Sequence, residues 1–202
     1  MNSRHLALIF LCLMGAVGGA LYGLRAARFR QFSPPSADET FVAIDRKHRR
    51  EEAALLPVGS LAPDFDLPTV GGGMVSLAQA CRGCKAVLVN FGFIDCAHCR
   101  TELPVLVNLN HALQGKGLTT ILIDVGDTDS ALRQWRIHNH VGFPVATTGS
   151  GPGANNRVLQ QYGVTAYPTT YLINADGKIL WRGTEEIDET TLRIALVQAD
   201  VL

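Results

Sequence analysis

The sequence lacks an excess of charge of either sign, because 18 lysine and arginine residues balance 18 aspartate and glutamate residues among 202. A zero net charge gives no support for nucleic acid or a strongly acidic partner. Charged residues make up only 18% of the chain and hydrophobic residues 47%, which fits a globular core with an added membrane-like segment. The sequence also lacks internal repeats, so we expect one domain of ordinary size plus some extra sequence.

One long apolar stretch, Leu6–Leu24, contains no charged residue and is flanked by basic residues on both sides. As a helix it would span about 28 Å, close to the thickness of one hydrocarbon core. A cleaved signal peptide and a retained anchor both fit, and the length favours the anchor. We therefore expect a signal anchor or transmembrane segment over residues 1–24. If the rest of the chain is exported, it lies where disulfides persist.

Residues 25–57 have the composition of a linker, with Ser33–Ser36 (SPPS) followed by the charge run Asp45–Glu52. The second half could form a short surface helix, but a solvated tether is the simpler interpretation.

Residues 58–202 alternate between strand and helix patterns. Ala86–Phe93 and Leu118–Val125 are nearly continuous apolar runs, which indicates two buried strands. Apolar residues recur at helical spacing from Cys96 to about Gln114, and Asn174–Gly177 is a strong hairpin signal. The other expected elements are helices over Ser130–Asn139 and Thr190–Val201, a short helix ending at Tyr162, and strands over Pro144–Thr147, Thr169–Ile173 and Lys178–Trp181. This order predicts an α/β fold with a mixed central sheet flanked by helices.

Four of the five cysteines form two C-x-x-C pairs. Cys96 follows a predicted buried strand and opens a predicted helix, whose amino-terminal partial charge and free N–H groups favour a thiolate. Cys99 lies one turn further on and can close a disulfide with Cys96. His98 could stabilise the thiolate, whereas the carboxylate of Asp95 would oppose it.

The second pair, Cys81 and Cys84, combines with the first into a zinc-like spacing. The intervening apolar run has no turn, however, and as a strand it would hold the pairs roughly 25 Å apart. This separation argues against a shared metal. A local disulfide or free thiol pair without a catalytic role is preferred, and a second redox pair is the alternative.

Five motifs occur in order: Ala62–Phe65, Val87–Phe91, Cys96–Cys99 with Glu102 and Pro104, Ala166–Thr170, and Asn174–Lys178. In this order they resemble the thioredoxin superfamily over about residues 58–202. Within it, the chain resembles the membrane-anchored TlpA/ResA-like thiol-disulfide oxidoreductases of the bacterial cell envelope, which are related to the redoxin and AhpC/TSA proteins.

The resemblance implies a thioredoxin-like fold and roles for single residues. Cys96 matches the nucleophilic cysteine and Cys99 the resolving one. Glu102 matches an acid that tunes the pair, and its weight as a proton acceptor increases because Asn90 replaces the buried Asp of cytoplasmic thioredoxins. Pro168 matches the proline that follows a cis peptide bond. Tyr167 and His98 would line the substrate groove beside it.

The resemblance also implies a function and a location. We expect exchange of disulfides with protein thiols and disulfides of the envelope, in the direction of reduction, with cytochrome c maturation as one possible setting. No cofactor is expected, since the cysteines carry the electrons, but a reductase requires a membrane electron donor. The expected location is a bacterial inner membrane, crossed once, with the catalytic domain in the periplasm.

The sequence departs from the family pattern before the first cysteine, where Asp95 stands in place of the usual Trp and Gly92–Ile94 replaces a Trp-containing stretch. These departures bear on the redox potential and the substrate and not on the fold. Two rival functions are a peroxiredoxin-type peroxidase, which the nearby second cysteine disfavours, and a non-catalytic module that binds copper or a partner protein. Copper is disfavoured because the chain has no C-x-x-x-C motif.

Overall fold

The computed structural model describes residues 36–150 and 156–202. The predicted anchor over residues 1–24 lies outside these ranges. Within them, no helix combines the length and the apolar character needed to cross a membrane. The chain divides after Ile44, and the second unit, residues 45–202, contains the sheet and both C-x-x-C pairs.

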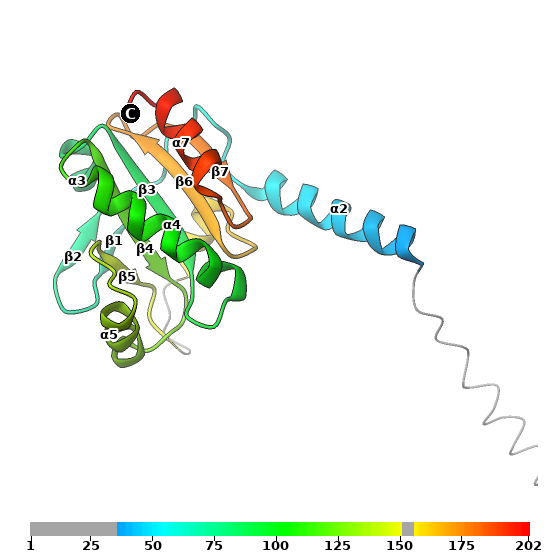
Figure 1. Cartoon of the computed structure of the whole chain (residues 1–202), viewed down its shortest axis with the longest axis horizontal. Helices are drawn as coiled ribbons and strands as arrows, with labels where there is room; N and C mark the ends of the chain where they lie inside the picture. Colours follow the sequence, from blue (N-terminus) through cyan, green and yellow to red (C-terminus); the bar gives the residue numbers. More distant parts are fainter. Residues whose placement is uncertain (1–35, 151–155) are drawn as a thin grey trace, which may run out of the picture. The chain divides into compact units, whose positions relative to one another are not determined.

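A five-stranded mixed sheet forms the centre of this unit (Figure 1). In spatial order the strands are β5 (Val145–Thr147), β4 (Leu118–Asp124), β3 (Ala86–Gly92), β6 (Thr169–Asn174) and β7 (Ile179–Gly183). The first three are parallel to one another, and β6 runs antiparallel to β3 and β7. Every residue of β3 is buried, as the continuous apolar run predicted.

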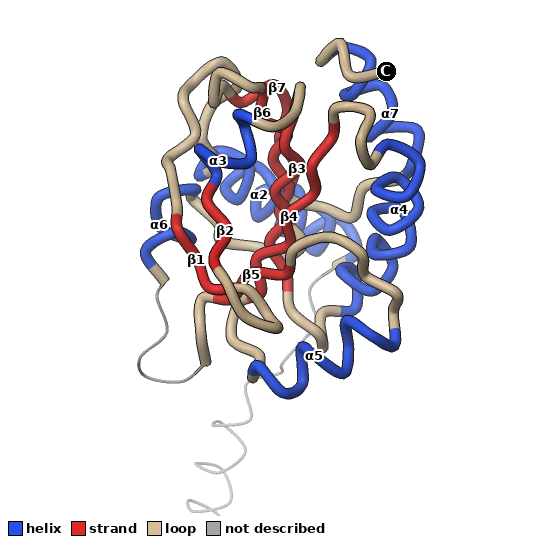
Figure 2. Tube along the Cα trace, turned by 90° about the vertical axis from the view of Figure 1, so that its left-hand side faces the viewer, coloured by secondary structure: helices blue, strands red, loops and turns tan. Residues whose placement is uncertain are grey.

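Helices cover both faces of the sheet (Figure 2). On one face lie α4 (Ala97–Leu113), α5 (Asp129–His138) and α7 (Glu189–Gln198), and on the other lie α3 (Leu77–Arg82) and α6 (Arg157–Tyr162) together with the small β1–β2 hairpin (Asp66–Pro68 and Met74–Ser76). Leu88 belongs to the first core layer, and Val87 and Val89 belong to the second. Alternate residues of one strand therefore build two separate layers of core.

The predicted elements from residue 86 onward are present with ends shifted by a few residues at most. Helix α5 begins one residue before the predicted start at Ser130, and the Thr128 hydroxyl accepts the hydrogen bond from the Ala131 amide that caps the helix. Helix α3 was not predicted, because it is only six residues long and too short for a periodic pattern.

The predicted linker contains a helix, α2 (Ala37–Ala54). Its start is a capping box in which Ser36 and Glu39 bond each other's backbone amides. Lys47 and Glu51 form an ion pair along it at 3.6 Å.

Gly163 ends α6 in the left-handed region, with φ of 65°. A Cβ atom there would lie 1.9 Å from the carbonyl oxygen of Ala54. Gly115, after α4, has φ of 74° and open space around its Cβ position. An alanine at Gly115 would introduce backbone strain alone, whereas an alanine at Gly163 would introduce backbone strain and steric overlap together.

We expect Gly115→Ala to lower the free energy of unfolding by about 1–2 kcal/mol, the cost of the left-handed conformation. Gly163→Ala should cost at least about 2 kcal/mol more, among the larger effects of single substitutions. Denaturant titration of both variants measures the difference. Equal losses would mean that the close approach at Gly163 is not maintained in solution.

Candidate active site

Cys96 and Cys99 form a disulfide with an S–S distance of 2.06 Å at the start of α4. Cys96 is the N-cap residue, and its sulfur accepts a hydrogen bond from the Cys99 amide at 3.1 Å. The same amide can stabilise a Cys96 thiolate once the disulfide is reduced. The predicted placement of the pair between a buried strand and a helix is present in the structure.

Glu102 lies one turn after Cys99 and is buried between α4 and the sheet, with 1% of its surface exposed. Asn90 donates a 2.8 Å hydrogen bond to one carboxylate oxygen, and the Ile187 amide and the Thr170 hydroxyl donate to the other at 3.3 and 3.4 Å. Burial raises the pKa of Glu102 to about 7, outweighing the lowering by these hydrogen bonds. A group of this pKa can both take and release a proton near neutral pH.

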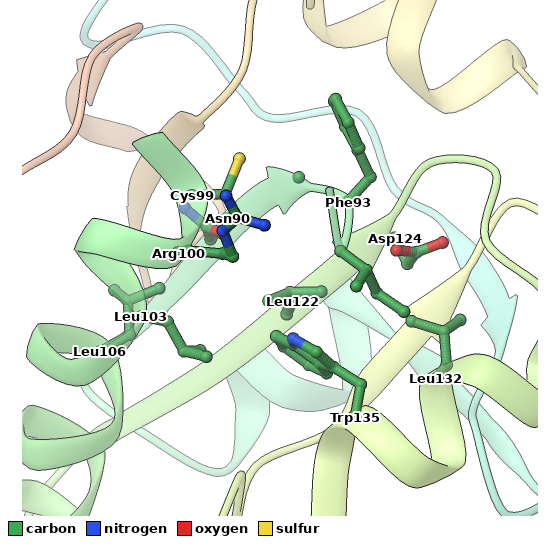
Figure 3. Close-up of a pocket in the computed structure, with 12 residues that line it drawn as sticks. Asn90, Phe93, Cys99, Arg100, Leu103, Leu106, Leu122, Asp124, Leu132 and Trp135 are labelled. Atoms are coloured by element: carbon green, nitrogen blue, oxygen red, sulfur yellow. The ribbon is translucent and has the colours of Figure 1, made fainter. Parts of the chain in front are cut away.

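Asn90 lies between Glu102 and the cysteines. A Cβ atom built on Gly92 would be 3.1 Å from the Cys99 sulfur and 3.9 Å from the side-chain oxygen of Asn90. Asn90, Gly92 and Cys99 also line one small cavity, in which Asn90 lies beside Cys99 (Figure 3). The side-chain amide of Asn90, which donates a hydrogen bond to Glu102, thus connects Glu102 to the region of Cys99.

One groove contains the three residues that were predicted to contact substrate, Tyr167, Pro168 and His98, and His98 lies between the two cysteines in the chain. The Tyr167–Pro168 peptide bond is cis, as predicted. The Tyr167 ring packs edge-on against Phe93, with ring centroids 5.5 Å apart. An aromatic wall next to a redox-active pair can hold an extended protein segment.

The two residues predicted to tune the redox pair are exposed. His98 places its Nδ1 atom 3.2 Å from a carboxylate oxygen of Glu186, and this pair faces solvent. Asp95 lies in the turn just before Cys96. Water and salt screen exposed charges. The buried Glu102 therefore has a stronger electrostatic effect on Cys96 and Cys99 than His98 or Asp95. The tuning roles of His98 and Asp95 stay predictions.

Cys81 and Cys84 are free thiols, so of the two preferred alternatives the structure contains the thiol pair and not the disulfide. Cys81 is buried in α3, and burial raises its pKa. The Cys84 thiol donates to the Ala80 carbonyl oxygen at 3.1 Å. They precede β3, whereas Cys96 follows it. Among the described residues, no cluster of three or more potential metal ligands occurs.

Sequence reasoning missed two partners of Glu102. Thr170 belongs to the quoted Ala166–Thr170 motif, but its hydroxyl was given no role. The Ile187 amide carries no sequence signal, because any residue can supply a backbone N–H.

Comparison with known proteins decides the family. Residues 58–182 match the AhpC/TSA family. The chain belongs to this family. Thiol-disulfide oxidoreductase ResA of Bacillus cereus is 28% identical over 173 residues, which cover 86% of this chain and 82% of the relative. ResA of Geobacillus thermodenitrificans is 31% identical, over 63% of this chain and 70% of the relative.

Solved structures give the fold of this AhpC/TSA protein. A putative thiol:disulfide interchange protein DsbE from Chlorobium tepidum superposes with a TM-score of 0.61 at 26% identity, over 71% of this chain and 98% of that one. A putative thioredoxin from Neisseria meningitidis gives 0.60 at 29% identity, over 68% and 88%. The thioredoxin-like fold is confirmed, and the protein is a TlpA/ResA-like oxidoreductase.

The raised pKa of Glu102 predicts how stability depends on pH. The folded state keeps the Glu102 proton up to about pH 7, whereas an unfolded glutamate releases it near pH ~4.3. Between these values the folded state binds more protons, so the free energy of unfolding falls as pH rises. Asp124, also buried with a raised pKa, acts in the same direction.

The free energy of unfolding should fall less between pH 5 and pH 8 in Glu102→Gln than in the wild type, by roughly 3 kcal/mol. Chemical denaturation of the oxidised protein at both pH values measures it. Glu189→Gln, which changes an exposed carboxylate on α7, is the control and should keep the wild-type decline. An undiminished decline in Glu102→Gln would contradict the assignment.

Proposed function

We propose that this oxidoreductase reduces disulfides in proteins of the bacterial cell envelope through Cys96 and Cys99. The observation that carries the proposal is the placement of the pair at the start of α4, one turn from a buried acid that titrates near neutral pH. An attacking thiolate and a proton acceptor are the two groups that disulfide exchange requires.

The reaction proceeds in two exchanges. The reduced Cys96 thiolate attacks a substrate disulfide, one substrate sulfur leaves as a thiolate, and a mixed disulfide forms. Cys99 then loses its proton, for which the Glu102 carboxylate beyond Asn90 is the acceptor, and attacks the Cys96 sulfur. The second substrate thiolate leaves, and the Cys96–Cys99 disulfide seen in the structure remains. Two electrons have passed from the protein to the substrate.

The groove at Tyr167 and Pro168 supports a protein substrate, because it also contains His98, which lies between the two cysteines in the chain. The relatives named thiol-disulfide oxidoreductase ResA and the protein named thiol:disulfide interchange protein DsbE support disulfide exchange as the reaction. Cytochrome c maturation is the setting that we propose from the ResA-like character of the chain.

We further propose that residues 1–24 anchor the protein in the inner membrane, with the thioredoxin-like domain in the periplasm. The uncharged stretch Leu6–Leu24 and its basic flanks support this location. A reductase in an oxidising compartment needs a supply of electrons, and we assign this supply to a donor within the same membrane.

Replacement of the resolving cysteine tests the exchange mechanism. Cys99→Ser should accumulate mixed disulfides with envelope proteins, because the Cys96 adduct can no longer be resolved. Non-reducing gels of whole cells detect the adducts. Cys96→Ser/Cys99→Ser is the matched control and should form none. Adducts that persist without Cys96 would place the reactive thiol elsewhere.

An exchange of the amino-terminal segment tests the anchor and the donor together. In cells, alkylation should find the full chain with Cys96 and Cys99 largely reduced and located in membranes. Replacement of residues 1–35 by a cleavable signal peptide should release the domain and leave the pair oxidised, because the membrane donor no longer reaches it. A full chain that is oxidised and absent from membranes would contradict both proposals.

A further inference from the structure

A second buried acid, Asp124, lies near the cysteines and has no part in the reaction described above. It is the last residue of β4, and 1% of its surface is exposed. One carboxylate oxygen accepts a 2.9 Å hydrogen bond from the Asp127 amide. The other, Oδ2, has no hydrogen-bond partner within residues 36–150 and 156–202. A buried polar atom without a partner is costly and requires an explanation.

The sheet register places Asp124 beside the redox pair. Asp124 pairs with Gly92 of the neighbouring parallel strand, and neighbouring strands are about 4.8 Å apart. Residues that pair in register point to the same face of the sheet. The Cβ position of Gly92 is 3.1 Å from the Cys99 sulfur, so Asp124 lies on the face that carries α4.

Gly92 has no side chain to fill the space against the Cys99 sulfur. Asp124 and Cys99 line a cavity of about 10 Å³, shared with Asn90 and Gly92. Figure 3 shows Cys99 and Asp124 at two sides of this cavity, with Leu122 and Trp135 along its wall. The volume is close to the minimum that holds one water molecule, and one water is within the reach of proton transfer.

Few other charged groups face Asp124. Asp127, from the loop before α5, accepts a 2.7 Å hydrogen bond from the Ile94 amide, and its carboxyl group also interacts directly with the carboxyl group of Asp124. Arg100 of α4 lines the cavity, and Glu102 lies behind Asn90. The remaining walls come from Phe93, Ile94, Trp135 and leucines of α4, β4 and α5. This apolar environment raises the pKa of Asp124 above its ordinary range, with a further contribution from Asp127.

We propose that Asp124 is a second proton acceptor for Cys99, used when Cys99 resolves the mixed disulfide. The S–H bond of Cys99 breaks, and its proton passes across the cavity to Oδ2 of Asp124. The Cys99 sulfur forms a bond to the Cys96 sulfur, and the substrate leaves as a thiolate. The proton then returns to solvent. The proposal rests on the exchange function proposed above and adds a separate exit for the proton.

A chromogenic aromatic disulfide, dithiobis(nitrobenzoate), separates the two steps in the reduced full chain. Attack by Cys96 releases the first coloured thiolate, and resolution by Cys99 releases the second. We expect Asp124→Asn to slow the second release by about tenfold above pH 7 and to leave the first unchanged. This is less than the usual ~10²–10⁴ for a proton acceptor, since Glu102 remains. Asn keeps the oxygen that accepts from the Asp127 amide.

Asp129→Asn removes an exposed carboxylate five positions along the same segment and should leave both releases at wild-type rates. Cys96→Ser supplies the background from the other thiols. An Asp124→Asn variant that equals Asp129→Asn, or that resolves faster, overturns the proposal. If the wild type itself shows no second release, the exchange function fails, and this proposal fails with it.

Carbon NMR of the wild-type carboxyl groups gives a test that needs no altered residue at the site. The titration midpoint of Asp124 should move upward when the disulfide is reduced, because the negative charge of the Cys96 thiolate that forms disfavours a second negative charge nearby. The midpoint of Asp129 should stay fixed. An Asp124 midpoint that is the same in both redox states overturns the proposal.

Discussion

The site depends on one constraint, which is the burial of the Glu102 carboxyl between α4 and the sheet without a cationic partner among the residues that bond it. An ionised carboxylate in such a place is costly unless hydrogen bonds replace water. The three donors come from β3, β6 and the chain just before α7, so the acid holds together the segments that surround the cysteines. These three hydrogen bonds offset only part of the cost of burying the ionised carboxylate. The residual cost keeps the proton exchangeable near neutral pH.

Strand β3 supplies both the core and the site from one pattern of alternation. Val87, Val89 and Phe91 face the layer of α3 and α6. Leu88 packs under α4 on the opposite face, where Asn90 and Gly92 follow it at the same two-residue spacing. Asn90 and Gly92, at the end of the strand, therefore lie next to the start of α4. The same strand that builds the core thus also positions the site.

Most of the fold was predictable from the sequence, because long apolar runs and helical spacing are local patterns. Cys96, Cys99 and Glu102 were predictable for the same reason: they share one strand–helix junction with a recognisable motif. Asp124 falls within the predicted strand Leu118–Val125 and was given no role, since its proximity to Cys99 arises from the register between β3 and β4. Pairing of strands far apart in sequence leaves no local signal. Helix α3, which is six residues long, was too short to detect.

The disulfide itself is largely enclosed: only 6% of the Cys96 surface is exposed, and Cys99 is half-buried. A sulfur atom of the substrate must approach in line with the S–S bond and close to van der Waals contact. A bridge held rigidly inside another folded protein cannot come that near. Selectivity among partners is therefore steric as well as electrochemical, and it favours cysteines on segments that are still unfolded or that can extend into the groove.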